Sequence, residues 1–212
     1  MTDQGFRKGS VKRVYKVWRY GKIREDIPHD GSIDYDNLAG ASRKPCTHST
    51  GKSMAFDQRE FRNAVGCFAT GVTVVTTLDK EGDRVGITAN SFSSVSLDPP
   101  LVLFCVDAKI NSFEAFENCE NFNINVLSEN QIELSNAFAR SSEDKWDGIE
   151  HVFGDNGCPI FENSIAVLEC DKYAIHSAGD HLIMVGQVTK IAYETVERHP
   201  LLYFNGAYAS LS

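Results

Sequence analysis

The spacing of apolar residues predicts one short helix followed by a chain made mostly of strands. Asp57 and Glu60 have the spacing of a capping box, and Phe61, Val65 and Phe68 follow on one helical face. Beyond this helix, segments that are β-branched or alternate between apolar and polar residues predict strands. These strands cover residues 72–78, a run from 84, 101–106, 121–127, 165–177, 181–193 and 201–204.

The connections between these strands are short, and two are typical of hairpins. Residues 79–83 (DKEGD) and 178–180 (AGD) each join two strands through turn-forming residues. Helical spacing returns at 111–117 and 129–139, whereas 141–155 is polar and is expected to form a loop. Strands joined by hairpins, with few helices between them, predict a mainly β protein: an antiparallel barrel with peripheral helices.

One segment in the middle of the chain fits neither a buried strand nor an ordinary loop. Residues 86–97 read GITANSFSSVSL and are mostly small or hydroxylic, although apolar strands lie on both sides. Asp98-Pro99-Pro100 follows and ends the segment before the next strand. The hydroxyl groups either bond to their own backbone in a serine-rich hairpin or line a binding site. Composition alone leaves both interpretations open.

Residues 1–53 differ in composition from the rest of the chain. They carry 11 Lys and Arg against 6 Asp and Glu, whereas residues 54–212 carry 10 against 23. No sustained helical or strand pattern continues beyond residue 24. We therefore predict a basic, flexible N-terminal extension at 1–53 and one folded domain at 54–212. The extension is either an arm that contacts a partner or an anionic surface, or an upstream segment without that role, since Met54 is a natural start for the domain.

The overall composition narrows the classes of function. The chain of 212 residues has a net charge of −8, and its acidic body argues against nucleic acid as a ligand, because such binding needs a basic surface. No apolar run is long enough to span a membrane, and the N-terminus lacks the apolar stretch of a signal peptide. The six cysteines form no CxxC pair, which favours a reduced, cytoplasmic protein.

Motifs for several kinds of site are absent from the sequence. There is no GxxxxGK[ST] phosphate loop, and no GxGxxG fingerprint follows a strand. His176 and His181 flank a turn without further ligand-like neighbours and no HExxH occurs, so no metal site is predicted. No GxSxG motif marks a serine nucleophile.

Six segments, in order along the chain, are similar to one known family. They are FRNAVGCFATGVTVVTT, GITANSFSSVSLDPPLVLFCV, FNINVLSENQ, SNAFA, GDH with Gly186 five residues on, and PLLYFNGAY. Through them, residues from about 56 to 210 resemble the short-chain NAD(P)H:flavin reductases, the reductase components of two-component flavin monooxygenases. The resemblance implies an FMN-binding split β-barrel of the Greek-key type.

The resemblance also implies which residues form the site. His181 would be catalytic, beside the nicotinamide and next to Gly179 and Asp180, although a histidine at a turn can also be merely exposed. Small and hydroxylic side chains would admit the flat flavin ring and bond to it, with Gly86 and Ala89 keeping room. The residues expected to bind flavin are Gly71, Val72, Thr73, Thr88, Ala89, Asn90, Ser91, Phe92, Ser94, Ser96, Phe138 and Ala139, with Lys109, Asn111 and Ser112 at its phosphate end.

The implied reaction is hydride transfer from C4 of NADH or NADPH to N5 of FMN or FAD. The cofactors carry this chemistry and the protein mainly holds two rings together, so no acid–base pair is needed in the sequence. We expect a cytoplasmic homodimer that supplies reduced flavin to a flavin-dependent monooxygenase, without metal, nucleic acid or membrane. The alternatives are a flavin-binding electron carrier reduced by another protein, and a related split-barrel oxidase or haem-binding module.

Overall fold

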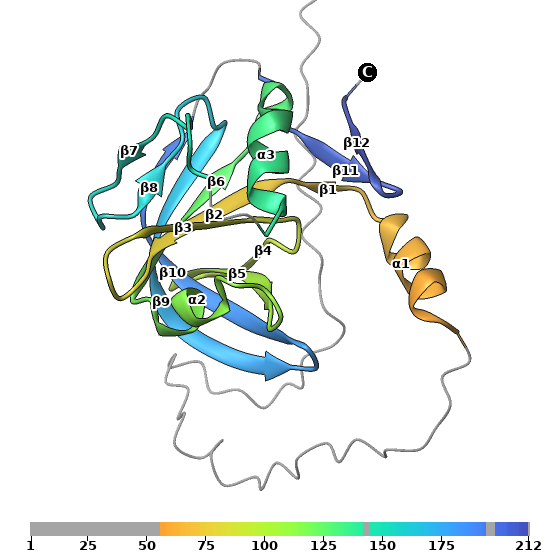
Figure 1. The fold of residues 1–212 in the computed structure, drawn as a ribbon, viewed down its shortest axis with the longest axis horizontal. Helices are drawn as coiled ribbons and strands as arrows, with labels where there is room; N and C mark the ends of the chain where they lie inside the picture. Colours follow the sequence, from red (N-terminus) through yellow and green to blue (C-terminus); the bar gives the residue numbers. More distant parts are fainter. Residues whose placement is uncertain (1–55, 142–144, 194–197, 212) are drawn as a thin grey trace, which may run out of the picture. The chain divides into compact units, whose positions relative to one another are not determined.

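The computed structural model describes residues 56–141, 145–193 and 198–211. The extension predicted at 1–53 lies outside these residues. Within them the fold is mainly β, as expected, with short helices at its periphery (Figure 1). None of these helices is long and apolar enough to cross a membrane.

Seven strands form one antiparallel sheet that carries most of the fold. In sheet order they are β3 (Arg84–Ala89), β2 (Thr73–Leu78), β6 (Asn121–Val126), β9 (Ala166–Ala178), β10 (His181–Tyr193), β5 (Pro100–Asp107) and β4 (Ser93–Leu97). Strands β3 and β4 follow each other in the chain, yet they are the two edges of the sheet and do not pair with each other. The sheet is therefore an open barrel, which confirms the predicted split-barrel class.

The remaining strands and the helices lie around this sheet (Figure 1). The small sheets are formed by β1 (Thr70–Gly71), β11 (Leu202–Phe204) and β12 (Ala207–Ala209), and by β7 (Val152–Phe153) and β8 (Pro159–Ile160). The helices are α1 (Gln58–Gly66), α2 (Phe113–Asn118), the 3-10 turn η2 (Glu129–Gln131) and α3 (Ile132–Ala139). Most of the predicted strands and helices are present, with ends shifted by a few residues.

The polar segment 86–97, whose structure the sequence left open, belongs mostly to strands. Its first residues end β3, the strand predicted from 84, and residues 93–97 form β4, which was not predicted. Only residues 90–92 are free of strand structure, and they carry the chain from one edge of the sheet to the other. Strand β4 escaped prediction because its side chains are mostly exposed and so lack an apolar alternation. The short strands β7, β8 and β12 were missed because two or three residues show no period.

Two clusters of buried side chains hold the elements together. In the first, inside the barrel, Phe104 packs edge-on against Phe116 of α2 and Phe122 of β6, with ring centroids 5.8 and 5.1 Å apart. In the second, Phe138 of α3 packs against Trp146 and Phe161, with centroids 4.7 and 5.2 Å apart. The second cluster holds α3 against β2 and β3.

Helix α1 differs from α2 and α3 because it buries none of its residues. Its capping box is formed as predicted: the side chain of Asp57 accepts from the amide of Glu60, and the side chain of Glu60 accepts from the amide of Asp57. The apolar side chains of Phe61 and Val65 are 54% and 52% exposed, and Phe68 just beyond the helix is 76% exposed. Within the described chain the ring of Phe61 stacks on that of Phe56, 6.0 Å between centroids, and the face stays largely exposed.

The thiols of the buried cysteines in the barrel are unreactive. Burial raises the pKa of the Cys158 thiol to about 11 and that of Cys170 to about 12, and it also raises the pKa of Cys119. These thiols therefore stay protonated near neutral pH and pack as small apolar groups. The described cysteines are all free thiols, and Cys67 and Cys105 are the two that are not buried.

Asn125 is a polar side chain that the fold requires. It is fully buried, its Nδ2 donates to the carbonyl of Val74 (3.1 Å), and its Oδ1 accepts from the amide of Phe161 (3.0 Å). Asn125→Ala leaves two buried backbone groups unpaired and is expected to lower the free energy of unfolding by about 2–4 kcal/mol. Urea unfolding measures this loss, and the exposed Asn118→Ala is the matched control. Equal losses in the two variants would contradict the prediction.

Candidate functional site

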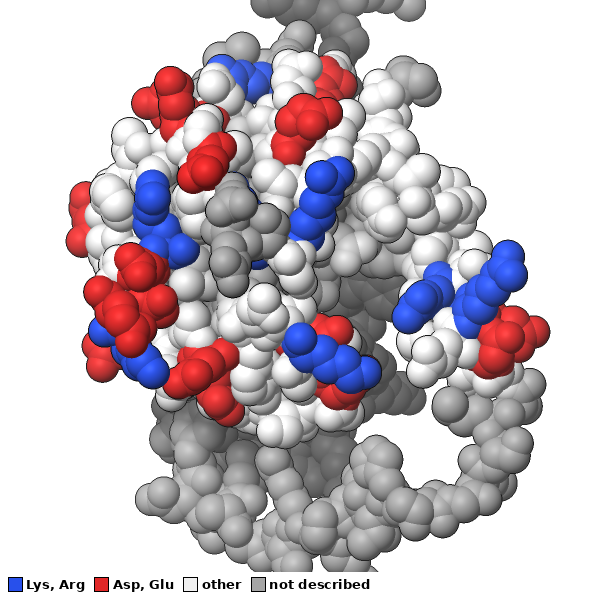
Figure 2. All heavy atoms as spheres, viewed as in Figure 1, with Lys and Arg blue, Asp and Glu red and all other residues white. Residues whose placement is uncertain are grey.

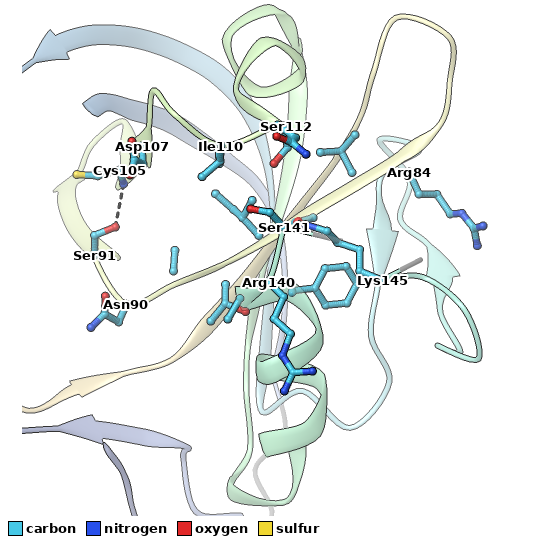
Figure 3. Close-up of a pocket in the computed structure, with 18 of the residues that line it drawn as sticks. Arg84, Asn90, Ser91, Cys105, Asp107, Ile110, Ser112, Arg140, Ser141 and Lys145 are labelled. Carbon is cyan, nitrogen blue, oxygen red and sulfur yellow. Dashed lines mark hydrogen bonds between the residues drawn. The ribbon is translucent and has the colours of Figure 1, made fainter. Parts of the chain in front are cut away.

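A cavity of about 570 Å³ lies along β3, beside the segment that joins the two sheet edges. One wall is β3 with residues 90 and 91, a second comes from the end of β5 and the start of α2, and a third from the end of α3 and residues 140–146. Figure 3 shows the labelled side chains around this space. The lining residues are Asp79, Arg84, Val85, Gly86, Ile87, Thr88, Ala89, Asn90, Ser91, Cys105, Asp107, Ile110, Asn111, Ser112, Phe138, Ala139, Arg140, Ser141, Lys145, Trp146 and His181.

Two hydroxyl groups of the polar segment form hydrogen bonds that hold the cavity wall in place. Thr88 donates from Oγ1 to the carbonyl of Ser135 in α3 (2.7 Å), which ties β3 to the helix. The Oγ of Ser91 accepts from the amide of Cys105 in β5 (2.9 Å), which ties the crossing segment to the other half of the sheet (Figure 3). Because Ser91 uses its oxygen as an acceptor here, its hydroxyl hydrogen stays available to a ligand.

Gly86 serves a different purpose from the one the sequence suggested. A Cβ at this position would lie 2.7 Å from two ring carbons of Phe138 and 3.3 Å from Trp146. The missing side chain therefore makes room for Phe138, which is buried and closes one side of the cavity. The expectation that Gly86 leaves space for a ligand ring is corrected: Phe138 occupies that space.

His181 stands at one end of the cavity, where the β9–β10 hairpin meets β5. It begins β10 and pairs with Asp107, another lining residue. Its Nδ1 lies 2.7 Å from Oδ1 of Asp180, and this hydrogen bond lowers the pKa of the exposed Asp180 carboxyl. The contact fixes the ring through Nδ1, and Nε2 makes no hydrogen bond within the described chain. A ligand can therefore use Nε2.

The opposite end of the cavity is cationic. Arg84, Arg140 and Lys145 all line it (Figure 3). The guanidinium of Arg84 lies over the ring of Trp146, 5.3 Å from its centroid, and its Nη1 is 3.2 Å from Nε2 of His151. Lys145 is half-buried, donates from Nζ to the carbonyl of Gly86 (3.3 Å), and has its pKa lowered by burial.

Nine of the residues predicted for the site line this cavity together. They are Thr88, Ala89, Asn90, Ser91, Asn111, Ser112, Phe138, Ala139 and His181. The structure places the others elsewhere. Val72 lines a second cavity of about 490 Å³, which shares Thr88, Asn90 and Ala139 with the first.

The other predicted residues lie outside both cavities. Thr73 is buried and donates to the carbonyl of Ala89 (2.7 Å), so it supports β3 from behind. Phe92 packs against the barrel core, and Gly71 has open space beside it. The lining of neither cavity includes Ser94 and Ser96 of β4, Lys109, or Gly179 and Asp180 of the hairpin turn.

Several lining residues were missed from the sequence, above all the three cations, Trp146 and Cys105. Lys145 and Trp146 belong to the polar stretch 141–155 that was expected to form a loop, and Arg140 directly precedes it. Cys105 was read only as part of a buried strand, but it is half-buried and is one of the lining residues of the cavity. No local pattern in one sequence marks these positions, because their grouping depends on contacts between distant segments.

The surface charges around the described fold are mixed. Figure 2 shows lysine and arginine side chains interspersed with acidic ones on the face drawn there. Among the described residues, no group of three or more His, Cys, Asp or Glu side chains is arranged to hold a metal ion.

Comparison with known proteins agrees with the geometry. Residues 65–212 match the family described as flavin reductase like domain. A protein of Rhizobium meliloti named a probable flavin reductase is 48% identical over 153 residues, which cover 72% of this chain and 49% of that protein. This chain therefore spans about half the length of that curated relative.

Two solved structures share the fold over most of their length. A homologue of nitrilotriacetate monooxygenase component B from Mycobacterium thermoresistibile has a TM-score of 0.70 and 38% identity, covering 74% of this chain and 87% of that one. An NADH:FAD oxidoreductase of Streptomyces globisporus, solved with NAD and FAD fragments, has a TM-score of 0.70 and 33% identity, covering 76% and 98%.

Proposed function

This chain belongs to the flavin reductase-like family, and from that premise we propose that it is an NAD(P)H:flavin oxidoreductase that supplies reduced flavin to a monooxygenase. The observation that carries the proposal is the cavity at the barrel opening. It joins a hydroxyl-bearing wall, an available histidine nitrogen and a cationic end in one space. The relatives named as a flavin reductase and an NADH:FAD oxidoreductase support the reaction, and the cavity supports the binding.

The residues present fit a flavin. The cavity volume of about 570 Å³ falls within the roughly 300–1,000 Å³ typical of small-molecule sites. Its walls are small or flat near β3, with Ala89 and Ile87 as apolar surface, and Ser91 offers a hydroxyl donor. Flavin, when bound, supplies the hydride acceptor for the nicotinamide. The protein's part is to hold the flat ring against β3, shield it from water and position the reductant.

His181 is proposed to orient the nicotinamide of NADH or NADPH. Its ring is fixed by the Asp180 contact, and Nε2 remains as the group that meets the ligand. Asp180 and Gly179 act on the nicotinamide only by shaping this turn, since neither lines the cavity. No proton transfer from His181 is required, because hydride transfer itself moves no proton to the protein.

His181→Ala is expected to lower kcat/KM for NADH roughly tenfold, which corresponds to one lost hydrogen bond. Flavin affinity should change little, since the histidine lies at one end of the cavity. Steady-state oxidation of NADH with FMN measures the first, and flavin fluorescence quenching measures the second. His176→Ala, on the neighbouring strand β9, is the matched control. Unchanged kcat/KM in His181→Ala would remove the histidine from the proposed role.

Bound flavin is expected to protect Cys105 from alkylation. Cys105 lines the cavity, whereas Cys67 is exposed, does not line it and serves as an internal control. At an FMN concentration ten times its Kd, iodoacetamide should modify Cys105 roughly tenfold more slowly, in proportion to the free protein. Peptide mass spectrometry follows both sites in one sample. Equal rates with and without FMN would place the flavin outside this cavity.

The direct test of the proposed function is rapid mixing of flavin-loaded protein with NADH or NADPH. Bleaching of the flavin absorbance near its visible maximum is the expected result. Persistent flavin colour with both nucleotides would instead favour the electron carrier, which another protein must reduce. Repeating the assay with FMN and FAD identifies the preferred flavin, and an absorption spectrum of the purified protein tests the oxidase or haem-binding alternative.

We further propose that the protein is a cytoplasmic homodimer. The apolar face of α1 supports a second copy as partner, because Phe61, Val65 and Phe68 all stay more than half exposed. The free, protonated cysteines fit a reducing compartment. Light scattering of the purified protein measures the mass, and a monomer at micromolar concentration would contradict the homodimer.

A further inference from the structure

The ammonium group of Lys145 is held in the cavity wall, where none of the described carboxylates pairs with it. Its Nζ donates to the carbonyl of Gly86 (3.3 Å), and no carboxylate pairs with it among the described residues. The side chain is half-buried, and burial lowers its pKa because the charged form loses hydration. A cation kept in such a place costs free energy unless an anion joins it.

The charges around Lys145 favour an anion from the ligand. Arg84 and Arg140 also line the cavity and add positive potential to it, with their guanidinium groups directed away from Lys145 (Figure 3). Asp79 also lines the cavity, but its Oδ1 already accepts from the amides of Glu81 and Asp83 in the hairpin turn. Asp107 belongs to the other end, beside His181.

Hydroxyl and amide groups complete this end of the cavity. Ser112 and Asn111, at the start of α2, line the cavity near Val85, the neighbour of Gly86. The Ser112 hydroxyl makes no hydrogen bond to its own helix. A tetrahedral anion between these groups and Lys145 would receive both hydrogen bonds and a full opposite charge.

We propose that Lys145 binds the phosphate group at the end of the flavin side chain, and that it thereby selects FMN and FAD over riboflavin. This inference rests on the proposed flavin reductase function and names the residue that sets the choice of flavin. Arg84 and Arg140 contribute through the potential of this end, while Lys145 makes the direct contact.

Lys109 was the lysine expected at the phosphate from the sequence, and the structure gives it a different setting. Its side chain is exposed and does not line the cavity, and its backbone amide donates to Oδ1 of Asp107 (2.9 Å). Water hydrates the charge of an exposed lysine and dissolved salt screens it, so a contact with a ligand phosphate adds little binding free energy. Lys109 therefore provides a matched control of the same residue type.

The test compares the affinities of riboflavin, FMN and FAD by fluorescence quenching in the full chain. Wild type is expected to bind FMN and FAD at least about tenfold more tightly than riboflavin, as suits a charge-assisted hydrogen bond. Lys145→Met should raise the Kd for FMN and FAD about tenfold and leave riboflavin within twofold. Lys109→Met should leave the Kd of all three within twofold.

Two further measurements keep the test independent of a folding defect. Lys145→Arg retains the charge and is expected to keep FMN affinity within several-fold. In wild type, raising the salt concentration should weaken FMN binding and leave riboflavin binding unchanged, since screening acts only on the charged ligand.

The opposing outcomes are distinct. Equal loss of FMN and riboflavin affinity in Lys145→Met, loss in Lys109→Met instead, or loss for FAD alone would each overturn the assignment. Equal affinity of wild type for riboflavin and FMN would also overturn it, while the proposed reductase function would stand. Failure of wild type to bind any flavin would overturn the proposed function and this inference together.

Discussion

Gly86→Ala is expected to lower the free energy of unfolding by about 2 kcal/mol and to weaken flavin binding roughly tenfold. The new Cβ would lie 2.7 Å from two carbons of the Phe138 ring. That ring cannot withdraw, because Trp146 and Phe161 pack against it with centroids 4.7 and 5.2 Å away. Either the ring moves into the cavity or α3 moves away from β3, and both alter the wall that faces the flavin.

A second substitution makes this prediction specific. Phe138→Leu in the Gly86→Ala background removes the overlapping ring atoms and should restore part of both losses, whereas Phe138→Leu alone should destabilise the protein. Urea unfolding gives the stability terms of this double-mutant cycle, and fluorescence quenching by the protein gives the FMN affinities. Strictly additive losses would show that Gly86 and Phe138 do not act through each other.

Gly186→Ala is expected to cost more stability, about 3 kcal/mol, with little effect on flavin affinity per folded molecule. Gly186 lies in β10 opposite Val102, and a Cβ there would overlap Cζ of Phe122 and approach Cβ of Cys170 to 3.0 Å. Phe122 is fully buried and packed edge-on against Phe104, so it has no free space to enter. The substitution therefore overfills the barrel core rather than the cavity.

Gly71→Ala is the matched control for Gly186→Ala. Gly71 lies in β1 with no atom within 4 Å of the position that a Cβ would take, so alanine should be accepted with little change in stability. Thermal or urea unfolding of the two variants measures the difference. A similar loss in both would mean that the cost comes from glycine removal in strands in general and not from the core contact.

The sequence predicted the strands and helices with strong periods and missed those without one. Strands β9 and β10 and helix α3 were found because long apolar patterns reflect which side chains are buried. Strand β4 was missed because its side chains are mostly exposed, and a polar strand at a sheet edge resembles a loop in composition. The assignment of fold class survived this error because it rested on the whole series of motifs.

The sequence likewise predicted some residues of the candidate site and missed others. The residues of β3 and of the crossing segment were predicted because the polar run stands out between apolar strands. Lys109 was expected at the phosphate because it follows the matching segment that ends at Val106, where the resemblance places phosphate contacts, and Lys145 was not considered. Which lysine binds the phosphate depends on which side chain lines the cavity. The residues next to a lysine in the sequence do not show whether its side chain is buried.

By itself, the sequence determined the family, the succession of most strands along the chain and the polar segment of the candidate site. These depend on local residue patterns and on the order of the motifs along the chain. The tertiary structure decided that β3 and β4 are opposite edges of an open sheet, so that the polar run crosses the barrel opening. It also decided that Lys145 meets Gly86, 59 residues earlier in the chain. Contacts of that kind arise from packing of the whole domain, because a side chain's distant partners depend on how every intervening element folds.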